Sequence, residues 1–186
     1  MGVVESPKAY DSDSNLESDK ASAVYALKLA GAGYSGVTYD PDDQITQTIG
    51  IGSTAFGRVV SYDQNTGVLK YWQDRTLAGF NTSGQSFTQN TDPTYGFHLN
   101  RFTASPTSDG SFNIIGGSTT LAIQTSFTGL STVINSRTYY LGQSFTEGVS
   151  QPEVKKYSGN IIYVDNRASI TRSANQKEDI KVILQF

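Results

Sequence analysis

The sequence predicts a mainly β protein, with an antiparallel β-sandwich type of architecture, hairpins, long loops and little helix. The first observation is the composition: Ser, Thr, Asn, Tyr and Phe are plentiful among the 186 residues, which include 18 glycines. Long helices need more Ala, Leu, Glu and Lys than this. The second observation is that two segments have the pattern of β-hairpins. The third is a charged fraction of 17%, which is typical of a folded chain rather than a disordered one.

The length suits one domain that covers residues 1–186, because a chain of this size can bury a single core. A division into two lobes, about 1–80 and 81–186, is equally compatible with the length. The sequence contains no cysteine, so disulfides and thiolate metal sites are excluded. We expect stability to come from packing and hydrogen bonds.

The distribution of charged and apolar residues argues against two classes of partner, nucleic acids and membranes. The formal net charge is −3, and the basic residues are scattered, with Lys155 and Lys156 as the only adjacent pair. Nucleic-acid binding needs clustered Lys and Arg that displace counterions from phosphates, so we expect no nucleic-acid partner. No run approaches the roughly 18 apolar residues that cross a bilayer, so we expect no membrane partner.

The clearest hairpin lies between Ala55 and Asp74. Two runs rich in β-branched and aromatic residues flank a short polar loop at Asp63–Gly67, and the second run is Val68–Gln73. A loop that ends in glycine can supply the positive φ that returns the chain. This segment therefore predicts two paired antiparallel strands.

Further strands are predicted from alternating apolar residues and from runs of β-branched and aromatic residues. They are Tyr25–Ala30, a second hairpin of Asn113–Ile115 and Thr119–Thr125 around Gly116-Gly117, one strand at Ser131–Leu141, and short strands within Tyr95–Phe102.

The first twenty residues are polar and acidic. Asp11, Asp13 and Asn15 have the spacing that opens a calcium-binding loop, but the glycine and the twelfth-position Glu of that motif are missing. A solvated entry loop is the better interpretation. Ser14 and Glu17 have the spacing of a capping box, which predicts a short helix.

A glycine-rich stretch, Gly31–Gly36, matches the Gly-x-Gly-x-x-Gly pattern of dinucleotide-binding folds. That pattern requires a helix to begin there, so that its N-terminal amides face the pyrophosphate. The following Val37–Asp43 is β-branched, acidic and interrupted by Pro41. We interpret the stretch as a turn and expect no nucleotide cofactor.

No arrangement in the sequence is assigned to catalysis, to a metal or to a cofactor. His98 is the only histidine, which excludes a two-histidine zinc site within one chain, and no Gly-x-Ser-x-Gly elbow accompanies it. It lies between Phe97 and Leu99, so a packed or hydrogen-bonded sheet histidine is the better interpretation. We therefore assign no residue to catalysis.

The last thirty residues, Tyr157–Phe186, contain two strand-like apolar runs. The second run, Ile180–Phe186, ends the chain on an aromatic residue. Burial of Val182, Leu184 and Phe186 would contribute several kcal/mol at about 25 cal/mol per Å² of apolar area. We therefore expect a buried terminal strand pair.

The same region resembles a known family. Ser158–Arg167 reads Ser-Gly-Asn-Ile-Ile-Tyr-Val-Asp-Asn-Arg, and Gln-Lys-Glu-Asp-Ile follows at 176–180. This ending resembles the C-terminus of the dimeric baseplate wedge subunit of contractile-tailed bacteriophages. The segment Thr54–Phe80 is similar to versions from marine cyanobacterial phages. Better-known members are longer at the N-terminus, so we interpret the chain as a short form or as the C-terminal part of a longer family protein.

The resemblance implies a mainly β structural protein of the virion tail baseplate, not an enzyme, assembled in the cytoplasm of the host bacterium. Family members form homodimers and assemble with other baseplate wedge proteins, and the baseplate rearranges to trigger sheath contraction. Asn166 and Arg167 are candidates for a fixed polar junction in the closing segment. Arg167 would pair with Asp165 or Glu178 in the same chain, or with a neighbouring subunit.

Two alternative functions stay open at the level of sequence. A carbohydrate-binding or adhesin-like β-sandwich of a phage tail or cell surface would need a flat platform of exposed aromatics, formed by Trp72, Tyr71 and Tyr95. Trp72, the only tryptophan, is better interpreted as a partly buried sheet anchor. A tail-associated glycan hydrolase would need two carboxylates that converge in a cleft.

Overall fold

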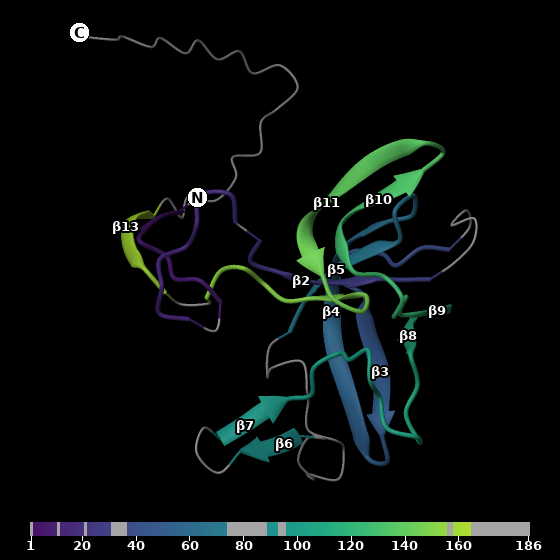
Figure 1. The fold of residues 1–186 in the computed structure, drawn as a ribbon. Helices are drawn as coiled ribbons and strands as arrows, with labels where there is room; N and C mark the ends of the chain where they lie inside the picture. Colours follow the sequence, from purple (N-terminus) through teal and green to yellow (C-terminus); the bar gives the residue numbers. More distant parts are fainter. Residues whose placement is uncertain are drawn as a thin grey trace, which may run out of the picture.

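Figure 1 shows the chain in a computed structural model, which describes residues 2–10, 12–20, 22–30, 37–73, 89–92, 96–155 and 158–164. For residues 89–92 and 96–99 it describes the backbone alone. Within these ranges the regular structure consists of antiparallel strands, and no helix is present. The predicted mainly β, antiparallel fold with long loops is therefore confirmed.

Seven strands form one sheet in the order β12-β2-β5-β4-β3-β8-β9. In chain order they are β2 (Tyr25–Lys28), β3 (Gln44–Gly50), β4 (Ser53–Asp63), β5 (Val68–Trp72), β8 (Asn113–Gly116), β9 (Thr119–Ala122) and β12 (Val149–Ser150). Pairing of β8 with β3 and of β12 with β2 means that strands from both sides of residue 80 share this sheet.

The two ends of this sheet meet. Beyond β2, the N–H of Ala30 donates to the carbonyl of Ala122 at 2.7 Å, and the N–H of Gln124 donates to the carbonyl of Lys28 at 2.8 Å. Leu29 and Ile123 form an antiparallel bridge between these two bonds. The sheet therefore curls around an interior, with the continuation of β9 against the continuation of β2.

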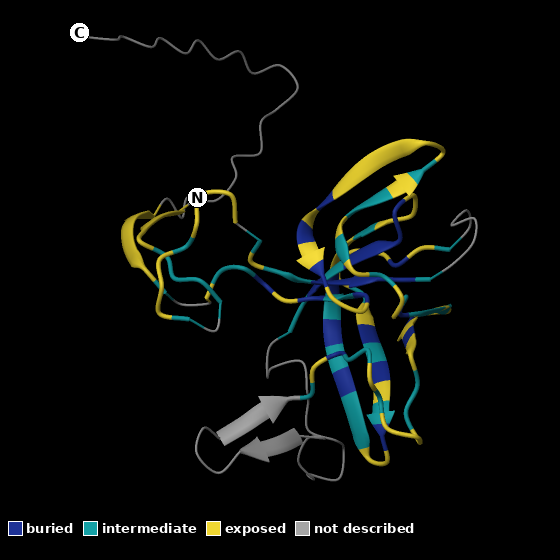
Figure 2. Cartoon of the chain, in the orientation of Figure 1, coloured by how far each residue is buried: buried dark blue, intermediate teal, exposed yellow. Residues whose placement is uncertain are grey.

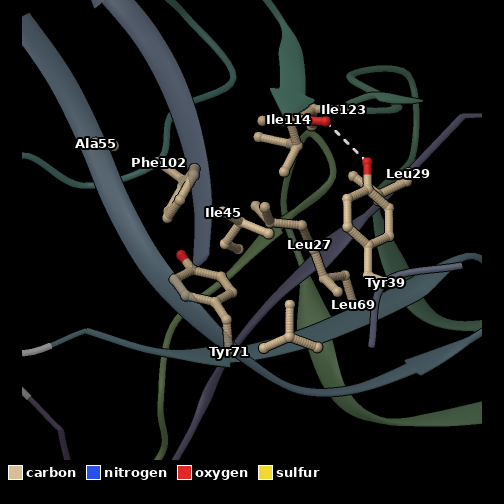
Figure 3. Close-up of a cluster of buried hydrophobic side chains, with 11 residues drawn as sticks. Leu27, Leu29, Tyr39, Ile45, Ala55, Leu69, Tyr71, Phe102, Ile114 and Ile123 are labelled. Atoms are coloured by element: carbon tan, nitrogen blue, oxygen red, sulfur yellow. Dashed lines mark hydrogen bonds between the residues drawn. The ribbon is translucent and has the colours of Figure 1, made fainter. Parts of the chain in front are cut away.

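One apolar cluster fills this interior, and Figure 3 shows most of its side chains. Its buried members are Leu27, Leu29, Tyr39, Ile45, Ala55, Val59, Leu69, Tyr71, Phe102, Ile114 and Ile123. The hydroxyl of Tyr39 donates to the carbonyl of Ile114 at 2.8 Å and accepts from the N–H of Leu121 at 3.1 Å. Because a buried hydroxyl without a partner is costly, these bonds tie the segment before β3 to the β8–β9 hairpin.

A second layer covers the outer face of the sheet at β2 and β5. It is the hairpin of β10 (Gly129–Ile134) and β11 (Arg137–Phe145). Ala26, Val68, Leu141 and Phe145 form a separate buried cluster between the layers, with Phe127 packed against it. The strand predicted at 25–30 is therefore present as β2, but it is buried on both faces, as the dark blue ribbon in Figure 2 shows.

Two further strand pairs lie outside the central sheet. One pairs β1 (Gly2–Glu5) with β13 (Asn160–Val164), and the other pairs β6 (Gln89–Asp92) with β7 (Gly96–Leu99). The β7 strand agrees with the short strands predicted within residues 95–102. In Figure 1 the β1–β13 pair stands to one side, away from the central sheet.

Both predicted hairpins are confirmed, as β4–β5 and β8–β9. Gly67 has a φ of 67° and Gly117 a φ of 55°, so both turns use the left-handed region that glycine adopts most easily. The carboxylate of Asp63 holds the first turn by accepting from the N–H of Asn65 at 2.9 Å and from the hydroxyl of Thr66 at 2.6 Å. Local turn chemistry therefore determines these two pairs.

The prediction of one strand at Ser131–Leu141 is wrong, because the segment is a hairpin. Asn135 and Ser136 have positive φ values of 49° and 62°. They return the chain so that Ile134 pairs with Arg137. Two adjacent residues of positive φ are the geometry of a type I′ turn, in which Asn is common and Gly is the usual second residue. Serine at the second position hides this signal.

The capping-box prediction of a short helix after Ser14 is also wrong. Asn15 forms an antiparallel bridge with Lys8 instead. The carboxylate of Glu17 pairs with the ammonium of Lys20 at 2.7 Å, so it is used in a surface ion pair rather than as a cap. The antiparallel bridge between Asn15 and Lys8 therefore replaces the helix that the local sequence pattern predicts.

The prediction of a buried terminal strand pair is only partly met. The first run is a strand, β13, but it pairs with β1 and is exposed along its whole length. The prediction that this strand is buried is therefore wrong. β1 satisfies the hydrogen bonds along one edge of β13, but none of the described residues packs over its faces. The second run, Ile180–Phe186, lies outside the described residues.

Candidate protein interface

The β1–β13 ribbon carries large apolar side chains that remain exposed. Its register places Val3 opposite Tyr163 and Val4 opposite Ile161. Successive strand residues point to opposite faces, and the neighbours Ile161 and Ile162 are 70% and 63% exposed, so both faces of the ribbon are open (Figure 2). The exposed apolar residues of the ribbon are Val3, Val4, Ile161, Ile162, Tyr163 and Val164.

A surface of this kind is a candidate for contact with another molecule. Soluble monomers rarely expose large contiguous apolar patches, and those that occur often mark contacts with other molecules. A two-stranded ribbon is also marginally stable in water unless something packs on it. We therefore take the β1–β13 ribbon as the candidate interface.

The ribbon belongs to a larger unit, which we call the terminal arm and which consists of residues 2–10, 12–20, 151–155 and 158–164. Backbone bonds join its two halves: the N–H of Tyr10 donates to the carbonyl of Glu153, and the N–H of Lys155 to that of Lys8, both at 2.8 Å. The N–H of Lys8 also donates to the hydroxyl of Ser158 at 2.9 Å. These bonds give the ribbon a defined base.

The acidic residues of the calcium-like spacing serve this base. The ammonium of Lys155 pairs with Asp13 at 2.7 Å, and this hydrogen bond and charge lower the pKa of Asp13. The side-chain carbonyl of Asn15 accepts from the ammonium of Lys8 at 2.8 Å, while Asp11 lies outside the described residues. In the part of the chain that the structure describes, no group of three or more His, Cys, Asp or Glu is placed to hold a metal ion.

Arg101 joins the terminal arm to the central sheet. Its guanidinium lies over the ring of Tyr10, 5.4 Å from the centroid, and over the ring of Tyr25 at 5.6 Å. It also donates to the hydroxyl of Tyr10 and, at 2.7 Å, to the side-chain carbonyl of Gln151. Burial, followed by the hydrogen bond with Tyr25, raises the pKa of Tyr10, so the phenol stays neutral. The contact is therefore a cation–π and hydrogen-bond junction.

This junction continues into the interior of the sheet. The ring of Tyr25 stacks on that of Tyr71, with centroids 5.4 Å apart, and Tyr71 meets Phe102 edge-on at 4.8 Å. Burial raises the pKa of Tyr71. Since Tyr71 and Phe102 belong to the interior cluster, the orientation of the arm is coupled to the packing of the core.

A second junction lies where the chain leaves the arm. The N–H of Ser22 donates to the carboxylate of Glu153 at 2.9 Å, and the Ser22 hydroxyl donates to the side-chain carbonyl of Gln143 at 2.6 Å. The Gln143 amide, which is fully buried, donates to the hydroxyl of Ser150 at 2.8 Å. Polar side chains therefore hold the arm at two places.

Among the described residues, the exposed aromatic platform that the carbohydrate-binding alternative requires is not formed. Trp72 is half-buried in β5, which agrees with a sheet anchor. Tyr71 is only 1% exposed, so it cannot contribute to a flat exposed surface. Tyr95 lies outside the described residues.

Other residues considered from the sequence are only partly described. His98 lies in β7 opposite Asn90, and its side chain lies outside the described part. The glycine-rich stretch Gly31–Gly36 and the polar junction candidates Asn166 and Arg167 also lie outside the described residues, as do Asp165 and Glu178, the ion-pair partners considered for Arg167.

Sequence reasoning predicted the β13 strand but missed its pairing with β1 and missed Arg101, which anchors the terminal arm. β1 has four residues, too few for a periodic pattern, and its partner lies at the other end of the described chain. Arg101 is 91 positions from Tyr10, so no local signal connects them. The one available hint was the apolar pair Val3-Val4 beside an otherwise polar segment.

Comparisons with known proteins found no family model, curated protein or solved structure that matches this chain. The residues that the structure describes include no helix with the length and apolar character of a membrane span. The exposed ribbon and the C-terminal resemblance are therefore the grounds for inferring a function.

Proposed function

We propose that the protein is a structural component of a phage tail baseplate wedge. It acts through protein–protein contacts in baseplate assembly and in the rearrangement that triggers sheath contraction. In this proposal it forms a homodimer, binds other wedge proteins, resides in the virion after assembly in the bacterial cytoplasm, and performs no catalysis.

One observation carries the proposal: the segment that resembles the wedge family is also the exposed apolar strand. The resembling motif begins at Ser158, and β13 displays four consecutive apolar side chains, Ile161–Val164, all exposed. A segment that serves folding alone would be expected to bury such residues in its own core. Exposure of this motif supports a role in contact with another protein.

The energy available at this surface is enough for a specific contact. Burial of a side chain such as Ile or Val contributes about 1.5–3 kcal/mol relative to leaving it in water. A partner that covers one face of the ribbon would bury two or three such side chains, before the costs of association are subtracted. Ile161 and Ile162 are the most exposed and are therefore the residues to test.

The attachment of the ribbon also suits an assembly that rearranges. Arg101 and Gln143 hold the terminal arm through polar and cation–π contacts, which can be exchanged at lower cost than an apolar core. Rearrangement of protein assemblies commonly uses elements with two alternative packings. The arm is the part of this chain that fits such a role.

The test is reconstitution with wedge proteins of the same phage, followed by size-exclusion chromatography with light scattering. The wild-type chain is expected to dimerise and to co-elute with at least one wedge protein. A chain carrying Ile161→Ser and Ile162→Ser is expected to lose co-elution. Ile51→Ser is the matched control, because Ile51 is 85% exposed at the β3–β4 turn, away from the ribbon.

Two results would contradict the proposal. One is a wild-type chain that stays monomeric and co-elutes with none of the wedge proteins. The other is equal loss of co-elution with Ile51→Ser and with the ribbon variant, which would indicate non-specific adhesion. Thermal unfolding of each variant shows whether the fold has been kept.

A further inference from the structure

A cleft of about 290 Å³ lies between the β4–β5 hairpin and β11, and it shares no residue with the terminal arm. Its buried apolar lining residues are Val68 and Leu141, at 5% and 6% exposed, and they belong to the cluster between the two layers. The cleft is lined by Ser61, Asp63, Thr66, Val68, Lys70, Tyr139, Tyr140 and Leu141. The cleft therefore lies where the β10–β11 hairpin meets the β4–β5 hairpin, and Figure 1 shows the β10–β11 hairpin extending from the central sheet.

The hairpin presents a mixed apolar and basic face along this opening. Alternation along β11 places Arg137 and Tyr139 on the same face as Leu141, which packs toward the sheet. The register adds Ile134, which pairs with Arg137. Tyr139 is 39% exposed at the edge of the cleft. An aromatic side chain that is half-covered in this way can receive an apolar group from outside.

The charges at the cleft favour an acidic ligand. Lys70 lies on β5 directly opposite Ser61, and its ammonium has no hydrogen bond or ion pair within the described ranges. The guanidinium of Arg137 likewise makes no hydrogen bond or ion pair with any described residue. Asp63 keeps its negative charge, but both of its oxygens are directed into the turn, where they accept from the N–H of Asn65 and the hydroxyl of Thr66. The cations are therefore the groups left to bind a ligand.

We infer that this cleft binds an acidic, extended peptide segment of a partner protein. One apolar side chain of the segment packs against Tyr139 and the floor at Leu141, and a carboxylate of the segment pairs with Lys70. Arg137 at the hairpin tip attracts a second acidic residue. This inference goes beyond the proposed function, because it depends on neither the ribbon nor the baseplate.

The probe is the peptide acetyl-Glu-Asp-Phe-Asp-Glu-amide, titrated into ¹⁵N-labelled full-length protein and followed by amide chemical shifts. We expect saturable shifts at Ser61, Lys70 and Tyr139, and none at Ile161 on the ribbon. A dissociation constant on the order of 10–1,000 μM is expected for one anchor with a few charges. A peptide with Lys at the four acidic positions and one with Gly in place of Phe serve as probe controls.

Substitutions identify the residues responsible. Lys70→Glu is expected to weaken binding about tenfold or more, because it replaces attraction by repulsion at the carboxylate. Lys155→Glu makes the same change of charge on the terminal arm and is expected to leave binding within about twofold, since exposed charges beyond a Debye length are screened. Lys70→Gln and Tyr139→Ser provide milder variants whose amide spectra report whether the fold is intact.

The inference is overturned by any of three results. The acidic peptide produces no saturable shifts at the cleft, the basic peptide binds as tightly as the acidic one, or Lys155→Glu weakens binding as much as Lys70→Glu. The first result excludes the site, and the other two show only general charge attraction. None of these results bears on the ribbon, so the proposed function is tested separately.

Discussion

Gln47 is a fully buried polar side chain in β3, and its replacement should be among the most damaging substitutions in the chain. Its amide donates to the carbonyl of Thr103 at 2.8 Å and to the carbonyl of Ser111 at 2.9 Å. Its side-chain carbonyl accepts from the N–H of Thr103 at 2.8 Å. The Gln47 side chain therefore holds the segment that precedes β8 against β3.

Replacement of Gln47 by Ala removes all three bonds. Each contributes about 1 kcal/mol net, so their loss costs about 3 kcal/mol. The N–H and carbonyl of Thr103 and the carbonyl of Ser111 are left facing a new cavity, which adds to this cost, and a water that enters would recover part of it. We therefore expect Gln47→Ala to lower the free energy of unfolding by about 3–4 kcal/mol, well above the typical value of about 1 kcal/mol.

The measurement is urea unfolding followed by tyrosine and tryptophan fluorescence. Gln44→Ala is the matched control, because Gln44 lies in the same strand with an exposed side chain, and its expected effect is within about 0.5 kcal/mol. A loss for Gln47→Ala no larger than that of Gln44→Ala would refute the reasoning, since it would mean that the three bonds have no net value.

Gln47→Glu separates hydrogen bonding from volume. A carboxylate at this position would face two carbonyl oxygens, so its pKa would be raised above that of an exposed Glu. The folded form would then bind the proton more tightly than the unfolded form, and stability should fall as the pH rises through this range. A variant whose stability does not depend on pH in the acidic range would contradict the geometry around Gln47.

Three further predictions concern other elements. Tyr39→Phe should cost about 1–2 kcal/mol in urea unfolding, because it deprives Ile114 and Leu121 of the buried hydroxyl; no measurable loss would refute this role. Gly67→Ala should cost about 1–2 kcal/mol, because its φ of 67° is left-handed, and an unchanged unfolding midpoint would contradict that turn. Burial lowers the pKa of Lys28 below 10.5, its value in the unfolded chain, because the folded protein favours the neutral amine. The folded state is therefore most stable, with respect to this group, above pH 10.5, and it loses that stability as the pH falls through the lower folded pKa. Lys28→Met should flatten this rise of stability with pH, and parallel pH profiles of the two proteins would count against it.

Sequence patterns determined the parts of this fold that depend on near neighbours. The β4–β5 and β8–β9 hairpins follow from short loops with Gly67 and Gly117, because a turn of positive φ and its flanking β-rich runs lie within about twenty residues. The mainly β class follows from composition for the same reason, since strand propensity is summed residue by residue. The Asn135-Ser136 turn shows the limit, because its second residue lacks the usual glycine.

The candidate interface, the β1–β13 ribbon, could be predicted from the sequence only in part. Ile161–Val164 was recognised as a strand and as the segment of the wedge resemblance, but apolar patterning alone predicted that it would be buried. Periodicity states which residues are apolar and cannot state whether anything covers them. In the described structure nothing does, so the same residues become a candidate surface.

What the sequence by itself determined is therefore the class and the local hairpins, while the wedge resemblance stays a prediction. The tertiary structure decided which strands meet and which faces are covered: Val3 against Tyr163, Leu29 against Ile123, and Arg101 against Tyr10. Such contacts join residues nearly a hundred or more positions apart, where no turn geometry relates them. Their pairing depends on the free energy of the whole packed chain, because the entropy of closing long loops is recovered only when the complete sheet and core form together.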